Sequence, residues 1–295
     1  MKILDFGSVC EDIVYSVDHI TKQGETQASF DRNVYIGGKG FNQALALSRA
    51  GGKVSFAGKL GKDSEHIEAL LTENGVDTTF FLIDPNIQTG HAVIQNSSDG
   101  NNAIVIYPAA NRSIDREMVD RVLADYGTGD VILLQNEISE IAYIIDRAYE
   151  KGMKIVMNPS PYNGYIREYD LSKIYLFLIN ELEGAEMSGK TEKEEMIDAL
   201  RLKYPDAHFV LTLGENGSVY FDHDTRIDQK AYPVKTVDTT AAGDTFTGYF
   251  LYGYFVENDI EKALDTASRA SAISVTIKGA VPSIPRRQDV LSYRF

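Results

Sequence analysis

The stretch that decides the fold is Val237-Asp238-Thr239-Thr240-Ala241-Ala242-Gly243-Asp244-Thr245-Phe246, where small residues lead from a strand-like segment into a predicted helix. Small residues let a ligand approach the backbone, and the N–H groups of a first helical turn can bind an anion. Asp244 lies in that turn, where the helix dipole stabilises negative charge. Taken alone, the pattern leaves two interpretations open for Asp244: a site carboxylate, or only an N-terminal helix charge.

Upstream of this stretch, short β-branched or aromatic runs alternate with helical patterns. Such alternation is typical of βαβ units, so we predict an α/β fold with a mostly parallel sheet and helices on both faces. Two long helical patterns close the chain, at about 242–256 and 259–275. The predicted buried strands are Ile3 to Phe6, Val54 to Ala57, Val131 to Leu134, Ile155 to Met157, Tyr175 to Ile179 and His208 to Leu213, and the predicted helices between them cover about 40–50, 64–74, 115–124, 139–150, 181–188 and 192–203.

Two stretches, at about 12–36 and 88–107, break this rhythm. Alternation such as Ala92-Val93-Ile94-Gln95 predicts strands there without intervening helices. These strands form either a small separate sheet or a pair of edge hairpins on the main sheet, and the pattern alone leaves both open. Because no repeat, low-complexity tract or Pro/Ser-rich linker interrupts the chain, we predict a single domain over residues 1–295.

The composition predicts a folded chain and excludes two classes of partner. Hydrophobic residues make up 43% of the 295 positions, too many for a disordered chain. Acidic residues outnumber basic ones by 43 to 29, and no Lys/Arg cluster forms a stripe that could follow a phosphate backbone. We therefore expect neither nucleic acid nor an anionic membrane as a partner.

The termini and cysteine content favour a soluble, cytoplasmic protein. The opening run Met1 to Phe6 lacks the apolar core and cleavage site of a signal peptide, and no later run approaches the roughly 18 to 20 apolar residues that cross a bilayer. Cys10 is the single cysteine, which excludes an intramolecular disulfide, and the five histidines have no metal-ligand spacing.

Five more motifs accompany the segment around Asp244. They are Gly37-Gly38-Lys39-Gly40-Phe41-Asn42-Gln43-Ala44, Asn158-Pro159-Ser160-Pro161, Asn180-Glu181-Leu182-Glu183, Leu211-Thr212-Leu213-Gly214-Glu215-Asn216-Gly217 and Lys278-Gly279-Ala280-Val281-Pro282-Ser283. In this order the six motifs resemble those of the ribokinase-like (PfkB-type) carbohydrate kinases, most closely the ribokinases. The resemblance implies a doubly wound α/β domain with a small β-sheet lid at the two irregular stretches. It also implies a homodimer through the lid, which would pair exposed strand edges.

The resemblance also assigns the catalytic residues. Phosphoryl transfer needs a positioned hydroxyl, stabilisation of the moving charge and a base. By resemblance, Asp244 takes the proton of a sugar hydroxymethyl group, and the backbone N–H groups of Ala241, Ala242 and Gly243 form an anion hole. The family often has Gly where this chain has Ala241, although ribokinases frequently carry Ala.

Magnesium and ATP sites follow from the same resemblance. Asn180 and Glu183 match the Asn-x-x-Glu motif that organises magnesium and its waters, and so sparse a motif suits an ion that keeps most of its water shell. Without the resemblance, the pair is a helix cap with a first-turn acid, and the glycines after residue 213 are hairpin glycines. The residues assigned to the ATP site, besides Asn180, are Thr212, Gly214, Gly217 and Ser268.

The sugar site is expected near the first predicted helix. Asp12 matches the aspartate that holds two sugar hydroxyls, and Glu137 matches an acid that reaches the sugar; carboxylates accept well from hydroxyl groups. Alone, Asp12 would be a loop acid and Lys39 a solvated helix charge. The contacts expected from the first helix are Gly38, Lys39 and Asn42.

Three residues depart from the ribokinase pattern. In Gly7-Ser8-Val9-Cys10-Glu11-Asp12, Cys10 replaces an amide that would hydrogen-bond the sugar, and a thiol is a poor donor and acceptor. Phe41 replaces a small residue, and His91 is bulkier than expected near the second lid strand. These departures place ribose specificity, rather than catalysis, in question.

A potassium ion beside the anion hole is also implied. One carboxylate among neutral oxygens suits a large monovalent ion and offers too little charge for a strong calcium site. The alternative is that Asp238 only caps a helix while Gly279 and Pro282 shape a turn. The assigned ligands are Asp238, Thr240, Ser274, Ile277, Gly279 and the Ser283 region.

The leading expectation is a magnesium-requiring, ATP-dependent kinase for the primary hydroxyl of a small sugar, ribose first. Alternatives are a fructose-type or modified sugar, or a nucleoside whose base would contact Phe41 and His91. A non-catalytic sugar-binding regulator is a further alternative, since fold alone does not establish activity. The intact Asp244, Asn180 and Glu183 argue against it.

Overall fold

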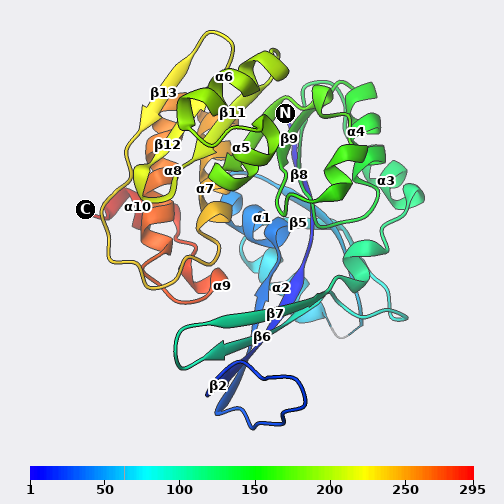
Figure 1. The fold of residues 1–295 in the computed structure, drawn as a ribbon. Coiled ribbons are helices and arrows are strands. Elements are labelled where there is room, and N and C mark those ends of the chain that lie inside the picture. Colours follow the sequence, from blue (N-terminus) through cyan, green and yellow to red (C-terminus); the bar gives the residue numbers. More distant parts are fainter. Residues whose placement is uncertain (63) are drawn as a thin grey trace.

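The main sheet of the computed structural model, which describes residues 1–62 and 64–295, lies between two layers of helices (Figure 1). Its strands are parallel from β11 to β5. At the other edge, β12 is antiparallel to β11, and β13 is antiparallel to β12. This confirms the predicted mostly parallel sheet. In spatial order the strands are β13 (Arg226–Gln229), β12 (Ser218–Phe221), β11 (His208–Thr212), β10 (Leu176–Asn180), β9 (Lys154–Asn158), β8 (Val131–Gln135), β1 (Ile3–Phe6), β4 (Ser55–Leu60) and β5 (Asp77–Ile83).

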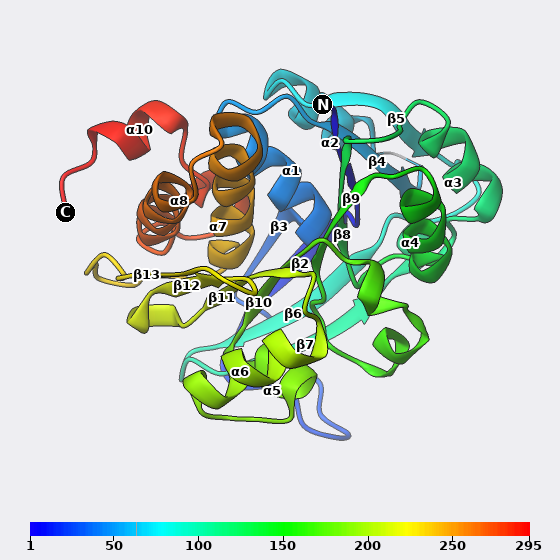
Figure 2. The same ribbon diagram turned by 90° about the horizontal axis from the view of Figure 1, so that it is seen from above.

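Two hydrophobic cores separate the sheet from its helices, which confirms the doubly wound architecture. Strands such as β8 are apolar on both faces because helices cover both. Figure 2 shows α7 and α8 on one side of β10 to β13 and α5 and α6 on the other. One layer contains α1 (Lys39–Arg49), α2 (Glu65–Glu73), α7 (Ala242–Leu251) and α8 (Ile260–Ser274), followed by α9 (Ala280–Ser283) and α10 (Arg287–Ser292); the other contains α3 (Arg116–Leu123), α4 (Ile141–Glu150), α5 (Glu181–Ser188) and α6 (Lys193–Lys203).

Polar side chains cap the N-termini of several of these helices. Asp115 accepts a hydrogen bond from the N–H of Met118 at the start of α3, and Asp259 accepts one from Lys262 at the start of α8. Such caps satisfy backbone donors that have no partner within the helix.

A second, four-stranded sheet resolves the choice that the sequence left open. Its spatial order is β3 (Asp31–Gly37), β2 (Cys10–Val17), β6 (His91–Ser97) and β7 (Asn102–Tyr107). The irregular stretches therefore form a separate small sheet rather than edge hairpins on the main one. Only Gly7, Ser8 and Val9 join the end of β1 to β2, so the small sheet lies beyond the carboxyl ends of the main strands (Figure 1).

Three strands of the main sheet, β5, β12 and β13, were not predicted, and two predicted elements differ in extent. The helix expected over 242–256 is α-helical only to Leu251 and continues as a π-helical turn, Tyr252–Glu257. β4 continues past Ala57 to Leu60 because Lys59 is tolerated inside it: its ammonium group lies 3.3 Å from Asp84 and donates to the carbonyl of Ser113. No helix in the described ranges is long and apolar enough to cross a membrane.

Candidate active site

Two adjoining cavities lie at the carboxyl ends of the parallel strands, where ligands commonly bind in open α/β sheets. The larger, about 700 Å³, lies between the β11–β12 turn and helices α7 and α8. The smaller, about 240 Å³, contains Lys39, Asn180, Glu183 and Asp244. The two cavities share Thr212, Thr239, Ala242, Gly243 and Phe246, and therefore form one continuous depression.

Asp244 is held in the first turn of α7 by two side chains of α1. Asn42 Nδ2 donates to Asp244 Oδ2 at 3.0 Å, and Gln43 Nε2 donates to Oδ1 at 2.9 Å. The two helices can approach because Gly248 faces α1, where an added Cβ would lie 2.4 Å from the backbone nitrogen of Leu47. Asp244 is 9% exposed. The carboxylate is therefore fixed and nearly buried, yet it lines the smaller cavity.

Gln43 begins a buried polar chain that sequence reasoning missed. Its Nε2 also donates to Asn158 Oδ1 at 3.2 Å, and its Oε1 accepts from Gln135 Nε2 at 2.9 Å. Gln135 in turn donates to Asp5 Oδ1 at 3.1 Å. Burial, reinforced by the charge of Asp244, raises the pKa of Asp5 well above its ordinary value. A polar residue in the middle or at the end of a buried apolar strand was the signal that could have identified Asp5, Gln135 and Asn158.

The three residues of the predicted anion hole differ in backbone geometry and accessibility. Ala241 has a left-handed backbone, φ 59°, which explains why glycine suits this position. Gly243 lies open beside it, since a Cβ added there would meet no atom of the described residues within 4 Å. However, the N–H of Ala242 donates to the carbonyl of Thr239 at 3.2 Å, so an anion would have to share or displace that bond.

The structure confirms the helix-cap interpretation of Asn180 and Glu183, and their assignment to magnesium stays a prediction. They form a capping box at the start of α5: the N–H of Glu183 donates to Asn180 Oδ1 at 2.9 Å, and the N–H of Asn180 donates to Glu183 Oε2 at 3.1 Å. Both also line the smaller cavity with Asp244. Glu183 is 4% exposed, so its carboxylate is buried beside that cavity.

Lys39 supplies positive charge to the same cavity. Burial alone would lower its pKa, but the carboxylates of Asp244, Glu137 and Glu183 outweigh burial and raise the pKa of Lys39 above its ordinary value. Lys39 is therefore protonated at neutral pH, and it differs from the solvated helix charge considered from the sequence because it lines a cavity among carboxylates.

The predicted sugar residues surround the first turn of α1. Gly38 is the residue before that helix, and Glu137 Oε2 accepts from the N–H of Lys39 at 3.1 Å and from the hydroxyl of Ser8. Asp12 lies on β2, where burial, with a contribution from the charge of Glu137, raises its pKa to about 6.

Cys10 lies within this group of carboxylates. Burial, followed by the charges of Asp12 and Glu137, raises the pKa of its thiol far above the ordinary range, so the thiol stays neutral.

Phe41 does not line the sugar site as expected. Its side chain is fully buried in the core between the sheet and α1, because position 41 points inward from that helix. His91 lies on β6, half-buried, with its ring 5.4 Å from that of Tyr107. The apolar wall proposed for a nucleoside base therefore loses Phe41.

Four of the five residues predicted for the ATP site line the larger cavity, and the fifth, Asn180, lines the smaller one. The four are Thr212, Gly214, Gly217 and Ser268. Gly217 also has a structural reason, since an added Cβ would lie 2.0 Å from the carbonyl oxygen of Gln229 in the neighbouring strand. The hairpin interpretation and the cavity-lining interpretation thus both hold for this glycine.

The segments assigned to a monovalent cation meet at Asp238. The N–H of Gly279 donates to Asp238 Oδ2 at 2.8 Å and that of Thr240 donates to Oδ1 at 2.9 Å. Burial opposes ionisation of Asp238, but these donors outweigh it and its pKa lies below the ordinary value. The hydroxyls of Ser274 and Ser283 donate to the carbonyls of Ser271 and Ala280, and the carbonyl of Ser274 accepts from Ile277.

Similarity to known proteins covers nearly the whole chain. The family model described as pfkB family carbohydrate kinase matches residues 2–287. A ribokinase from Haemophilus influenzae is 33% identical over 295 residues, covering 97% of this chain and 96% of the relative, and a deoxyribokinase from Salmonella typhi is 30% identical over 304 residues, covering 99% and 98%. The structure of Arabidopsis thaliana ribokinase complexed with ribose and ATP has a TM-score of 0.87 at 28% identity and covers 99% of both chains. Together with the geometry around Asp244, these similarities show that the chain belongs to the pfkB family of carbohydrate kinases.

Proposed function

We propose that this carbohydrate kinase transfers the γ-phosphoryl group of ATP to the primary hydroxyl of a small sugar, with ribose as the first candidate and Asp244 as the base. The observation that carries the proposal is the position of Asp244, fixed by Asn42 and Gln43 where the two cavities adjoin. A related ribokinase was solved with ribose and ATP, which supports both ligands.

The residues present suit ATP and magnesium. The larger cavity has ample volume for a nucleotide, and Gly214 and Gly243 leave its backbone accessible. When bound, ATP supplies the phosphoryl group and magnesium neutralises its charge. Glu183 would hold the ion through water, because one buried carboxylate is a sparse but adequate donor set for an ion that keeps its hydration.

Each step assigned to this chain uses a positioned side chain. Asp244 accepts the hydroxyl proton at a lone pair that its two amide donors leave unoccupied. Lys39 and the N–H groups around Gly243 would offset the negative charge that develops on the phosphoryl oxygens. Asp12 and Glu137 accept from the remaining sugar hydroxyls and fix the reacting one near Asp244.

A 2-deoxy sugar is the second candidate, and Cys10 favours it. A neutral thiol among carboxylates is a poor partner for a sugar hydroxyl, so a sugar that lacks one hydroxyl loses less there. The similarity to a deoxyribokinase points in the same direction. Fructose-type sugars and nucleosides are further candidates, and the assay below includes them.

The substrate assay measures ADP release with ATP and magnesium over ribose, 2-deoxyribose, fructose, other pentoses and hexoses, and nucleosides. We expect the highest kcat/KM for ribose or 2-deoxyribose. A purified, folded enzyme that releases no ADP with any of these sugars would contradict the proposal, and a clear preference for a nucleoside would reassign the substrate.

The proposal includes two further features supported by the resemblance. A potassium ion would be held by Asp238 and the carbonyls of the loop that ends at Gly279. A homodimer would form through the small sheet, where β7 exposes Ile104, Val105 and Ile106. Burying such an exposed apolar edge against a second copy would remove a surface that otherwise invites aggregation.

A further inference from the structure

Asp5 is the most deeply buried acidic side chain in the described part of the molecule. It lies in β1, paired with Phe56 of β4 and Leu133 of β8, and it is 0% exposed. The proposed reaction does not use it. A buried carboxyl group in the centre of a sheet is costly unless it has partners, so its retention needs an explanation.

The hydrogen bonds between Asp5 and Asp244 fix which end of each intervening amide is the donor. Gln135 points its Nε2 at both Asp5 Oδ1, 3.1 Å away, and Gln43 Oε1, 2.9 Å away. Gln43 therefore has its oxygen toward Gln135 and its Nε2 toward Asp244. Reversal of the Gln135 amide would set two carbonyl oxygens against each other and favour reversal of Gln43, which would then face the catalytic carboxylate with an oxygen.

Two oxygens of this polar chain, Asp5 Oδ2 and Gln135 Oε1, have no hydrogen-bond partner among the described residues. A proton on Asp5 provides a donor where both oxygens would otherwise be acceptors. Burial and the charge of Asp244 both raise the pKa of Asp5, and the hydrogen bond from Gln135 opposes them only in part. A neutral Asp5 can accept from Gln135 without adding a second negative charge beneath Asp244.

We propose that Asp5 is a positioning residue for the base: it fixes the orientation of the Gln135 amide and, through Gln135, makes Gln43 donate to Asp244. The inference rests on the proposed role of Asp244. Asp5 itself contacts neither substrate nor reacting atoms.

The test compares Asp5→Val, Asp5→Asn and Gln135→Leu, with Ile3→Ala as a matched control. Ile3 lies two residues away on the same strand face and outside the polar chain, so its variant reports the effect of destabilising β1 alone. For each variant, kcat and KM for the preferred sugar and for ATP are measured between pH 5 and 9, together with the melting temperature.

We expect Asp5→Val to lower kcat about tenfold with little change in either KM, and to shift the acid limb of the kcat profile to higher pH, because Asp244 loses a fixed donor. Asp5→Asn should stay within about threefold of the wild-type kcat, since its amide reproduces the shape and donor of a neutral acid. The double variant Asp5→Val/Gln135→Leu should lose no more than the larger single loss, because both act through Gln43. Ile3→Ala should lower the melting temperature but leave kcat unchanged.

Three results would overturn the inference: a wild-type kcat and pH profile for folded Asp5→Val, an Asp5→Asn enzyme as slow as Asp5→Val, or additive losses in the double variant. If Asp5→Val does not fold, Gln135→Leu removes the hydrogen bonds of the same chain. We expect it to show the same loss of kcat and the same shift of the pH profile. Near-normal turnover of Asp244→Asn would instead refute the proposed function, and the inference with it.

Discussion

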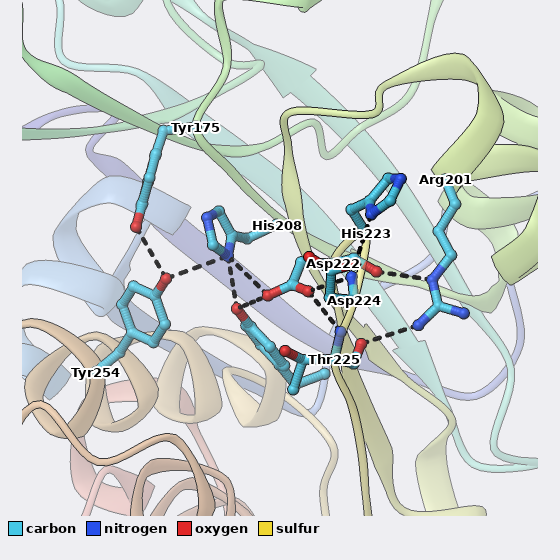
Figure 3. Close-up of polar contacts among 9 residues, drawn as sticks. Tyr175, Arg201, His208, Asp222, His223, Asp224, Thr225 and Tyr254 are labelled. Carbon is cyan, nitrogen blue, oxygen red and sulfur yellow. Dashed lines mark hydrogen bonds and ion pairs between the residues drawn. The ribbon is translucent and has the colours of Figure 1, made fainter.

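Two polar networks, one buried and one half-buried, occupy opposite ends of the main sheet. At the carboxyl ends of the strands, Asp244, Gln43, Gln135 and Asp5 form the chain beside the cavities. At the amino ends, a second network joins aromatic side chains to one histidine and one carboxylate (Figure 3). In it His208 Nδ1 lies 2.5 Å from the hydroxyl of Tyr220, that hydroxyl donates to Asp222 at 2.9 Å, and the hydroxyls of Tyr175 and Tyr254 lie 3.0 Å apart.

The surroundings of the two networks shift the pKa values of their ionisable side chains in different ways. Around the active site, neighbouring carboxylates raise the pKa of Lys39 and keep it charged. In the aromatic network, burial lowers the pKa of His208 and raises that of Tyr254, so both remain neutral near pH 7. Asp222 lies 3.5 Å from His208 and favours its charged form, but burial has the larger effect. Asp244 and the neighbouring Lys39 line a cavity, whereas no member of the aromatic network lines either of the two cavities described above. We therefore expect changes in the first network to affect turnover and changes in the second to affect stability.

The π-helical turn relates the two networks structurally. α7 begins with the turn that holds Asp244 and ends at Leu251, and the π turn that follows carries Tyr254 into the aromatic network. If the two networks are functionally distinct, changes in each should separate turnover from stability.

The largest expected effect is that of Asp244→Asn. Loss of the base should lower kcat by roughly 10² to 10⁴, with ATP binding retained. Asp222→Asn is the matched control in the aromatic network, because it makes the same change from carboxylate to amide in the half-buried network. It should reduce stability and leave kcat near that of the wild type. Equal losses of kcat in the two variants would contradict the separation of the two networks into one that affects turnover and one that affects stability.

Potassium should have the next largest effect. The ion would order the loop from Asp238 to Gly243, so kcat should rise by about tenfold, less than the roughly 10² to 10³ that removal of a direct oxyanion donor costs. KM for ATP should change less. The enzyme is dialysed into tetramethylammonium or sodium buffer and titrated with potassium chloride at constant ionic strength; a flat response contradicts the assignment.

The residues expected at the active-site end came from the resemblance to a family, and the positions of its motifs along the chain explain why they lie together. Asn180 with Glu183, and Thr212 with Gly214, each lie where a strand ends, and parallel strands bring such ends together. The Asp5–Gln135–Gln43 chain could not be predicted in this way, because its bonds join residues about 90 to 130 positions apart and depend on side-chain directions. Phe41 was misplaced for the same reason.

The aromatic network could not be predicted from the sequence. Its members lie at the start of β10 and β11, at the end of the antiparallel strand β12 and in the π turn. Its aromatic members, such as Tyr254 in a predicted helix, are ordinary core residues by pattern. The helix was predicted to continue to 256 because the change from α to π spacing leaves the apolar periodicity nearly intact. Only the packing of separate elements shows that the hydroxyl groups meet.

Sugar binding should depend on pH through Asp12. Its pKa of about 6 means that the carboxylate needed to accept two hydroxyls is lost as the pH falls through that value. KM for the sugar should then rise by up to about tenfold per pH unit below pH 6, while KM for ATP stays nearly constant. The Asp12→Asn variant is the control, since its KM, although high, should not follow this titration. A sugar KM that is constant from pH 5 to 8 would contradict the assignment.

Cys10→Asn should have a smaller effect, confined to specificity. A restored hydrogen bond to a sugar hydroxyl is worth about 0.5 to 1.5 kcal/mol, so kcat/KM for ribose should rise about two- to tenfold relative to 2-deoxyribose. Cys10→Ser serves as a control for the loss of the sulfur atom. An unchanged ratio, with good wild-type activity on ribose, would show that the thiol does not limit recognition.

The smallest expected effect concerns the pH dependence of stability in the aromatic network. The pKa of His208 is lower in the folded chain than the ordinary value near 6.5, so below that pH the unfolded chain binds a proton that the folded chain does not. The stabilisation is therefore complete above about pH 6.5 and declines as the pH falls below it. In denaturant titrations, the wild type should lose more stability between pH 7.5 and 5.5 than His208→Gln, which cannot titrate, and kcat at pH 7.5 should be the same for both. A lower kcat for His208→Gln would mean that the π turn transmits changes to Asp244, and the two networks would then be one functional unit.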